Sequence, residues 1–225
     1  MRTKTLLLTA ALSAAGIATS MAQVYSVNAV GYVNTPLVPG YNLVSNPLDN
    51  KTGNTIQNLF GTGIQGTIPN NLTIYYFNPD TDSFVTAVYD DLDGAFIPAS
   101  AASTVVAPGN GVFVRNPNTT GALVVTFVGE VPQGAASNTQ LPQGFSIKAS
   151  TVPVAGTVTE LQLPGAQGDR VFEWNAQTQA FITSSFDDLD NAWLPAPANI
   201  AVGEAFFLFK AAAGAWNRNF TIPTN

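Results

Sequence analysis

Two stretches of this chain decide its fold: residues 84–98 read FVTAVYDDLDGAFIP, and residues 181–195 read FITSSFDDLDNAWLP. Each begins with an aromatic-led alternating run, continues through Asp-Asp-Leu-Asp, and ends with an aromatic residue shortly before a proline. The spacing is constant, because Asp90 and Asp187 are separated by the same number of residues as Pro98 and Pro195 (187 − 90 and 195 − 98 both give 97). A match of this length indicates an internal duplication.

The duplication extends in both directions from these stretches. Matching segments are GYNL at 40–43 with GFSI at 144–147, IYYFN at 74–78 with VFEWN at 171–175, and GNGVFV at 109–114 with GEAFFL at 203–208. A border segment, VNAVGYV at 27–33, matches VTFVGEV at 125–131, and a weaker counterpart closes the chain at 216–222. Three related border strands therefore serve two units.

Both units are expected to be built from strands. Short β-branched and aromatic runs alternate with Gly, Pro, Asn and Asp clusters, as in the hairpin LTIYYF, NPDTDS, FVTAVY over residues 72–89,. No stretch has a sustained helical period, and residues 49–63 are expected to form a loop with at most one short helical turn. The sequence predicts an all-β fold of two homologous antiparallel modules, β-sandwich or barrel-like, each about 95 residues long. They span residues 23–131 and 132–225, and their border strands could be shared or exchanged.

The first 22 residues have the features of a secretory signal peptide. Met1-Arg2-Thr3-Lys4 is a short basic region, residues 6–17 are apolar, and Ser20-Met21-Ala22 is a small-residue cleavage site,. The apolar run is too short to span a membrane. We expect a protein that is exported to the extracellular space, the cell surface or the periplasm and is not inserted in a membrane.

Composition excludes several classes of function. The chain has no Cys and no His, and it carries 8 basic against 14 acidic residues, for a net charge of −6. Thiol chemistry, thiolate metal sites and a histidine base are therefore excluded, and the acidic balance argues against nucleic acid as a partner. No motif implies a cofactor. Only 10% of the residues are charged while 46% are hydrophobic, a composition that suits a protein that assembles or coats a surface.

Several motifs resemble those of a known group of proteins. QVYSVNAVGYVN at 23–34, PGYNLVSNPL at 39–48, PGNGVFV at 108–114 and VTFVGEVPQG at 125–134 resemble a group of uncharacterised secreted bacterial proteins. That group has an N-terminal VGY strand and GxNLxxxPL and PGxGFFV motifs, usually in tandem. The second unit departs from the pattern, with GFSIKAS at 144–150 and GEAFFLF at 203–209. The resemblance implies export and duplication, and it carries no activity that could be transferred.

The acidic corners are the first candidate site. Their carboxylates could supply oxygen ligands to Ca²⁺, or act as the acid and base of a glycosidase. The simpler interpretation is that each Asp bonds its own backbone to close a turn, with Gly94 or Asn191 in the left-handed conformation. We favour the turn, because a corner repeated in both units is more simply a structural part. The candidate metal ligands are Asp90, Asp91, Asp93, Asp187, Asp188 and Asp190.

Aromatic residues beside these corners are the second candidate. Phe96 and Trp193 occupy equivalent positions and could stack on sugar rings, although an aromatic at a fixed repeat position in an all-β module is more often part of the core.

The leading hypothesis is a non-enzymatic structural or surface protein. Its first strand, within residues 24–33, either pairs with the last strand to close the molecule or adds to the sheet edge of a neighbouring copy, giving head-to-tail assembly. The alternative is a module that binds extracellular polysaccharide, with or without calcium, through the acidic corners and Phe96 or Trp193.

Overall fold

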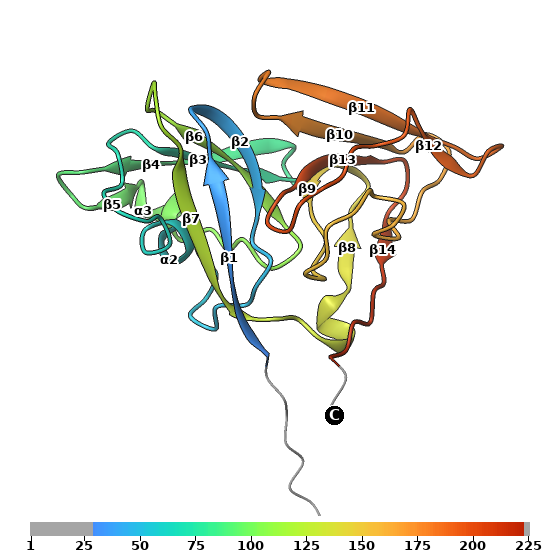
Figure 1. Cartoon of the computed structure of the whole chain (residues 1–225), viewed down its shortest axis with the longest axis horizontal. Helices are drawn as coiled ribbons and strands as arrows, with labels where there is room; N and C mark the ends of the chain where they lie inside the picture. The colour runs from blue at the N-terminus through green and yellow to red at the C-terminus, as the bar shows by residue number, and fades with distance from the viewer. Residues whose placement is uncertain (1–28, 223–225) are drawn as a thin grey trace, which may run out of the picture.

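The computed structural model describes residues 29–222, which form two β-rich units lying side by side (Figure 1). The fold is nearly all-β, with 44% strand and 7% helix, which confirms the fold class expected from the sequence. Within residues 29–222, no helix is long and apolar enough to cross a membrane. The expected signal peptide and residues 24–28 of the first border strand lie outside the described residues.

The first unit consists of a five-stranded and a two-stranded antiparallel sheet. Its strands are β1 (Val30–Leu37), β2 (Gly40–Ser45), β3 (Thr73–Asn78), β4 (Ser83–Asp90), β5 (Ala95–Ile97), β6 (Gly111–Asn116) and β7 (Leu123–Glu130), and its helices are α2 (Ile56–Phe60) and α3 (Ala99–Ala102). The larger sheet has the order β2-β6-β3-β4-β5, and β1 pairs with β7. The single turn of α2 lies within the segment that was expected to be a loop with one helical turn.

The second unit has the same arrangement. Its elements are the 3₁₀ helix η1 (Gly134–Ser137) and the strands β8 (Thr139–Leu141), β9 (Gly144–Lys148), β10 (Arg170–Asn175), β11 (Ala180–Asp187), β12 (Ala192–Leu194), β13 (Phe206–Lys210) and β14 (Gly214–Trp216). Its five-stranded sheet has the order β9-β13-β10-β11-β12, which corresponds strand for strand to that of the first unit, and β8 pairs with β14 as β1 pairs with β7.

The border strands are not exchanged between the units in residues 29–222. β1 pairs with β7 of its own unit over eight residues, and β14 pairs with β8 of its own unit over three. The strand that begins the described chain therefore does not pair with the one that ends it. Each unit completes its own small sheet because the chain finishes β7 before it crosses to the second unit (Figure 1).

Each unit encloses its own hydrophobic core. In the first, Ile74 and Val114 of the large sheet pack against Val125 and Phe127 of β7, and α2 closes one end with Phe60. In the second, the corresponding core is built from the large sheet and Trp216 of β14. Burying these side chains is the main favourable contribution to the stability of each unit, at about 1.5–3 kcal/mol for each large apolar side chain.

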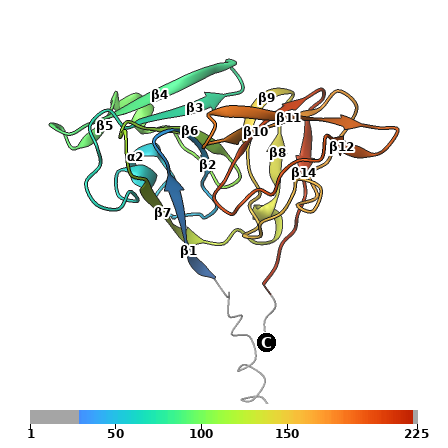
Figure 2. The same cartoon turned by 45° about the horizontal axis from the view of Figure 1, so that its top comes forward.

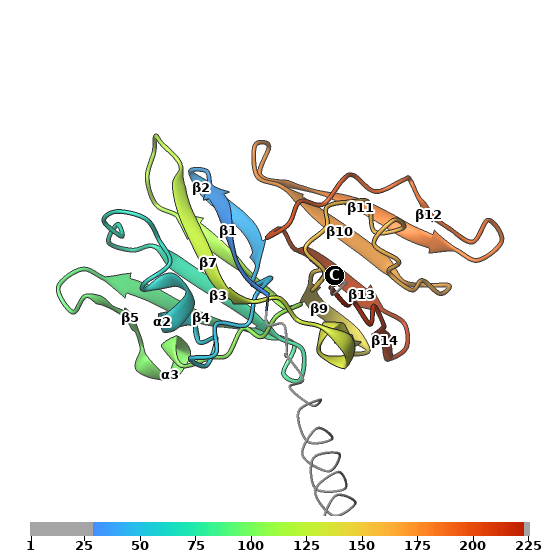
Figure 3. The same cartoon turned by 60° about the horizontal axis from the view of Figure 1, so that its bottom comes forward.

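The contacts that join the two units are related by pseudo-twofold symmetry. Val44 bridges to Glu204, and Lys148 bridges to Asn110, so that each unit offers the edge of one strand to a loop of the other. The amide of Ser45 donates to the carbonyl of Gly203 at 2.9 Å, and the amide of Ala149 donates to that of Gly109 at 3.0 Å. Figure 3 shows this junction from below, with β2 of one unit and β9 of the other on either side of it.

Aromatic side chains fill the space between the two large sheets. Phe77 packs on Phe207 of the second unit with ring centroids 5.1 Å apart, and Phe113 packs on Trp174 at 5.4 Å. These two edge-to-face pairs are related by the same pseudo-twofold relationship, and each is worth about 0.5–1.5 kcal/mol beyond its buried area. The junction is therefore a third core, shared by both units.

Candidate functional site

The first acidic corner is a closed turn at the end of β4. A carboxylate oxygen of Asp90, Oδ1, accepts hydrogen bonds from the amides of Leu92 (2.8 Å) and Asp93 (3.4 Å). Gly94 has a φ of 62°, in the left-handed region that favours glycine. The turn interpretation of the sequence is confirmed here.

The second corner repeats this geometry after β11. Asp187 Oδ1 accepts from the amides of Leu189 (2.9 Å) and Asp190 (3.4 Å), and Asn191 has a φ of 48°. Within residues 29–222, no three acidic side chains gather closely enough to hold a metal ion. The structure therefore does not bring together the carboxylates named as calcium ligands, which are Asp90, Asp91, Asp93, Asp187, Asp188 and Asp190.

Phe96 and Trp193 lie in the cores. Their side chains are only 2% and 4% exposed, and their rings pack edge-to-face on Tyr89 and Phe186 of the adjacent strands. Core side chains cover both rings, so neither presents a face on which a sugar could stack. Both residues are therefore core residues, which was the other interpretation of their positions in the repeat.

A different set of aromatic residues faces the solvent. The outer faces of the two large sheets meet along the top of the molecule, where β3 and β4 approach β10 and β11 (Figure 2). Four rings there are between 39% and 47% exposed and rest on the shared aromatic core below them. We call this set the aromatic surface, and it consists of Tyr41, Phe84, Phe145 and Phe181.

The outer edge of β1 is an unpaired strand edge. The amide of Val131 donates to the carbonyl of Ala29 at 2.8 Å, and along the register Val30 lies opposite Glu130 and Tyr32 opposite Val128. Hydrogen-bonded and non-hydrogen-bonded pairs alternate in an antiparallel ladder, so residues 30, 32 and 34 direct their N–H and C=O groups away from β7. Within residues 29–222, these groups take part in no backbone hydrogen bond to another segment.

The outer edge of β7, by contrast, is covered. The backbone groups of Glu130 exchange two hydrogen bonds with Asp49, at 2.8 and 2.9 Å. The amide of Thr126 donates to Gly63 at 2.7 Å, and the carbonyl of Val124 accepts from Gln65 at 2.9 Å. The fold thus protects one edge of this small sheet and leaves the other open.

The open edge carries exposed apolar side chains. Val30 and Tyr32 are 69% and 72% exposed, and Val128 beside Tyr32 is also largely exposed. The edge ends at Pro36, which has no N–H to offer. An exposed, apolar edge strand is a template for pairing with another chain.

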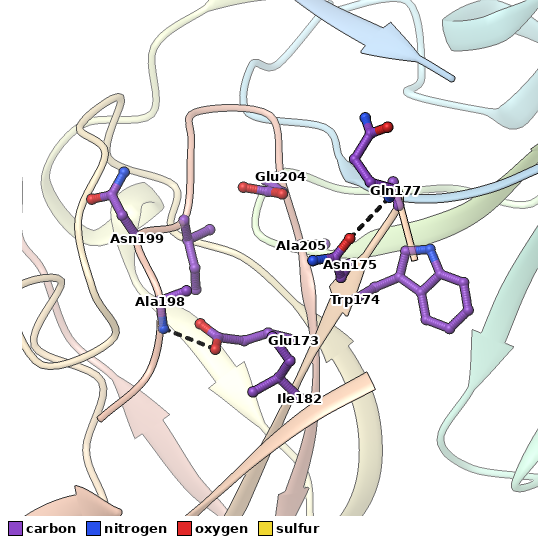
Figure 4. Close-up of a pocket in the computed structure, with 11 residues that line it drawn as sticks. Glu173, Trp174, Asn175, Gln177, Ile182, Ala198, Asn199, Glu204 and Ala205 are labelled. Atoms are coloured by element: carbon purple, nitrogen blue, oxygen red, sulfur yellow. Dashed lines mark hydrogen bonds between the residues drawn. The ribbon is translucent and has the colours of Figure 1, made fainter. Parts of the chain in front are cut away.

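A cavity of about 300 Å³ lies beside β10 and β13 in the second unit. Figure 4 shows Glu173 and Glu204 pointing into it. Glu173 is buried; its Oε2 accepts from the amide of Ala198 at 2.9 Å, and its Oε1 has no partner. Burial, reinforced by the negative charge of Glu204 and opposed by the Ala198 hydrogen bond, raises the pKa of Glu173.

A second cavity, of about 330 Å³, lies on the other side of the pseudo-twofold junction. Its Tyr76 and Asn110 align with Glu173 and Glu204 of the first cavity. Its Ser146 and Lys148 align with Asn42 and Val44, which line a neighbouring cavity that also includes Glu204. The two sides of the junction therefore differ in charge: one carries carboxylates and the other carries an ammonium group.

Sequence reasoning missed both cavities. The signal that could have revealed the second is a charge at a position where the other unit has an apolar residue, since Lys148 directly follows the matched segment GFSI and Val44 follows GYNL. The first cavity could have been revealed in the same way, because the charged residue Glu173 aligns with the uncharged residue Tyr76 of the other unit.

Comparison with known proteins supplies no relative: no family model, no curated protein and no solved structure matches this chain. The fold defines the class as an all-β protein of two units with the same strand order. A functional assignment therefore depends on the exposed edge, the aromatic surface and the two cavities.

Proposed function

We propose that this protein is a non-enzymatic structural protein of the extracellular space or cell surface, and that it associates with a second copy of itself through the outer edge of β1. The observation that carries the proposal is the open edge at Val30, Tyr32 and Asn34, whose backbone groups point away from β7. Export is the expectation from residues 1–22, and the low proportion of charged residues, 10%, is consistent with a surface that assembles.

The edge is complementary to itself. In an antiparallel pair centred on Tyr32, Val30 of one copy lies opposite Asn34 of the other, and Tyr32 lies opposite its own counterpart. All three residues direct their hydrogen-bonding groups toward the partner in this register, so the β1–β7 sheets of two copies form one four-stranded sheet. Isologous pairing of this kind closes at a dimer, whereas addition to a different edge would give the head-to-tail chains considered from the sequence.

Other free edges are poorer partners for β1. The large sheets end in β2 and β9 on one side and in β5 and β12 on the other. β2 and β9 have six and five residues, and each already bridges to the opposite unit, through Val44 and Lys148. β5, β12 and β14 are each three residues long. A three-residue strand offers few backbone groups, and short edges are one way in which proteins avoid unwanted pairing. The eight-residue β1 is the longest edge in the described part of the chain that could pair with another β1.

Size-exclusion chromatography with light scattering over a concentration series tests the proposal. The wild-type protein should form a dimer whose population rises with concentration. Changing both Val30 and Tyr32 to Lys should give a monomer, because two copies would place like charges in the new sheet. Val128→Lys is the control: it adds one lysine to the same face, but on the strand whose outer edge is already covered. A wild-type monomer at every concentration would overturn the proposal.

A second candidate function is polysaccharide binding, and the aromatic surface favours it. Tyr41, Phe84, Phe145 and Phe181 are rigid exposed rings on adjoining sheets, and such rings can stack on sugars. Retention on insoluble glycans should fall severalfold in Phe181→Ala and be unchanged by chelator, because the carboxylates at the corners are not gathered. Leu189→Ala, which changes an exposed apolar residue elsewhere, is the control. Equal retention of wild type and Phe181→Ala would contradict this role.

A further inference from the structure

Lys148 is a buried cation without an ionic partner. The two other lysines in residues 29–222 are ion-paired: Lys51 contacts Asp49 and Glu130, and Lys210 contacts the buried Asp169. Lys148 is only 7% exposed, and the one hydrogen bond of its ammonium group goes to Oδ1 of Asn110, at 2.8 Å. Two of its three N–H donors are therefore not used by side chains of the described residues.

The cavity beside Lys148 presents a second unused polar group. Ser146 lies two residues before Lys148 on β9, so both side chains are on the same face of the strand, and both line the cavity. The hydroxyl of Ser146 is buried and has no hydrogen-bond partner. A buried polar group without a partner costs free energy, so a ligand that accepts from Ser146 would remove that cost.

The electrostatics of the cavity favour a negatively charged ligand. Burial lowers the pKa of Lys148 from its ordinary value to about 8, because the charged form has lost its water and has gained no anion. The other titratable group lining the cavity is Tyr76, whose pKa is raised by burial and by the negative charge of Asp80, which lies next to the lining residue Pro79. The lining contains no carboxylate that would repel an anion.

We propose that this cavity binds a small organic carboxylate, with the ammonium group of Lys148 and the hydroxyl of Ser146 donating to its two oxygens. Phe77, Pro79 and Pro142 give the cavity apolar walls that accommodate the carbon skeleton, and the side chain of Gln140 is a further polar group in the lining. At about 330 Å³, the cavity is at the small end of the range for ligand sites. This site is independent of the β1 edge and does not depend on self-association.

Isothermal titration calorimetry with acetate and with glucuronate tests the site, with glucose as the uncharged control and sulfate as the control for a general anion site. Glucuronate should bind the wild-type protein and glucose should not. Lys148→Met keeps the length and removes the charge, and it should weaken binding at least tenfold. Ser146→Ala should weaken binding severalfold, whereas Lys51→Met, which removes an exposed and already paired charge, should leave it unchanged.

Proton linkage supplies a readout that a merely structural lysine would not give. An anion beside Lys148 favours its charged form, so binding near pH 8 should take up protons, and the measured heat should change with the ionisation enthalpy of the buffer. Affinity should decrease as the pH rises above about 8. The proposal is overturned if neither carboxylate binds at about 10 mM, if Lys148→Met binds as well as wild type, or if sulfate binds as tightly as both carboxylates.

Discussion

Val44 and Lys148 occupy equivalent positions in the two units, and each bridges to a loop of the opposite unit, Val44 to Glu204 and Lys148 to Asn110. The backbone arrangement is thus nearly symmetric while the side chains are not. The two edge-to-face aromatic pairs at the junction are equivalent to each other. The charged groups are not: Glu173 and Glu204 lie on one side of the junction, and Lys148 lies on the other. This asymmetry gives the molecule two chemically different cavities on a duplicated scaffold.

The titration of Lys148 should be visible in the stability of the protein. Its pKa is about 8 in the folded protein and near 10.5 when unfolded, so between these values the unfolded chain binds more protons. Stability contributed by Lys148 therefore rises with pH across this window, by up to about 3 kcal/mol. Denaturant unfolding of wild type and Lys148→Met at pH 7 and pH 10 measures this. Lys148→Met should be the more stable of the two at pH 7, and its advantage should shrink at pH 10; an unchanged difference would contradict the assignment.

Replacing Lys210 with Met should destabilise the protein at neutral pH, whereas replacing Lys148 with Met should stabilise it. It pairs with Asp169, whose side chain is fully buried and whose Oδ1 and Oδ2 also accept from the amides of Ala211 and Ala166, both at 2.9 Å. Lys210→Met leaves the Asp169 carboxylate buried without its cation, which should cost about 3–5 kcal/mol. Urea unfolding at neutral pH measures the loss. The control is Lys51→Met, which breaks exposed pairs and should cost less than about 1 kcal/mol.

Gly111 should be required for close approach of the two units. A Cβ at this position would lie 2.5 Å from Cβ of Ala205 and 2.6 Å from Cγ2 of Ile147, both in the second unit. Gly111→Ala should therefore push the units apart and destabilise the protein by about 1–3 kcal/mol. Gly214→Ala places a methyl group in open space and serves as the control in thermal unfolding. Equal midpoints for the two variants would show that the junction tolerates the added methyl group.

Glu173 should lower stability at neutral pH. Burial raises its pKa above the ordinary value, so between the two values the folded protein binds more protons, and stability falls as the pH rises through that window. Glu173→Gln keeps the acceptor for the Ala198 amide without the charge, so it should be more stable than wild type at pH 7. The difference should vanish below about pH 4, where Glu173 is protonated in both states. An advantage that persists at low pH would point to packing instead of charge.

The sequence predicted those parts of the structure that depend on local chemistry. The strands, the hairpin turn and the corner at Asp90 follow from residue types and their spacing, and Gly94 and Asn191 have the left-handed backbone expected of them. The face to which a side chain points was harder to predict. Phe96 and Trp193 are in three-residue strands, which are too short to show an alternation that distinguishes core from surface.

Contacts between segments far apart in the sequence could not be predicted from the pattern of residue types. The border strands were identified as related, but their pairing within each unit depends on the path of the chain after β6, which no local signal encodes. Lys148 could be read only as a polar residue ending a strand, and its burial arises because a loop of the other unit covers it at Asn110. Nor does any local signal show that Asp49 and Gly63 cover the outer edge of β7 while the outer edge of β1 stays open.

The most direct test of the account is the oligomeric state of Tyr32→Pro, measured by light scattering beside the wild-type protein. Proline removes the one N–H at the centre of the proposed pair, and that N–H makes no bond to β7, so circular dichroism should show a folded β protein. If the copies pair through β1, the wild-type protein forms a concentration-dependent dimer and Tyr32→Pro is a folded monomer. A Tyr32→Pro protein that dimerises as wild type does would contradict pairing through β1.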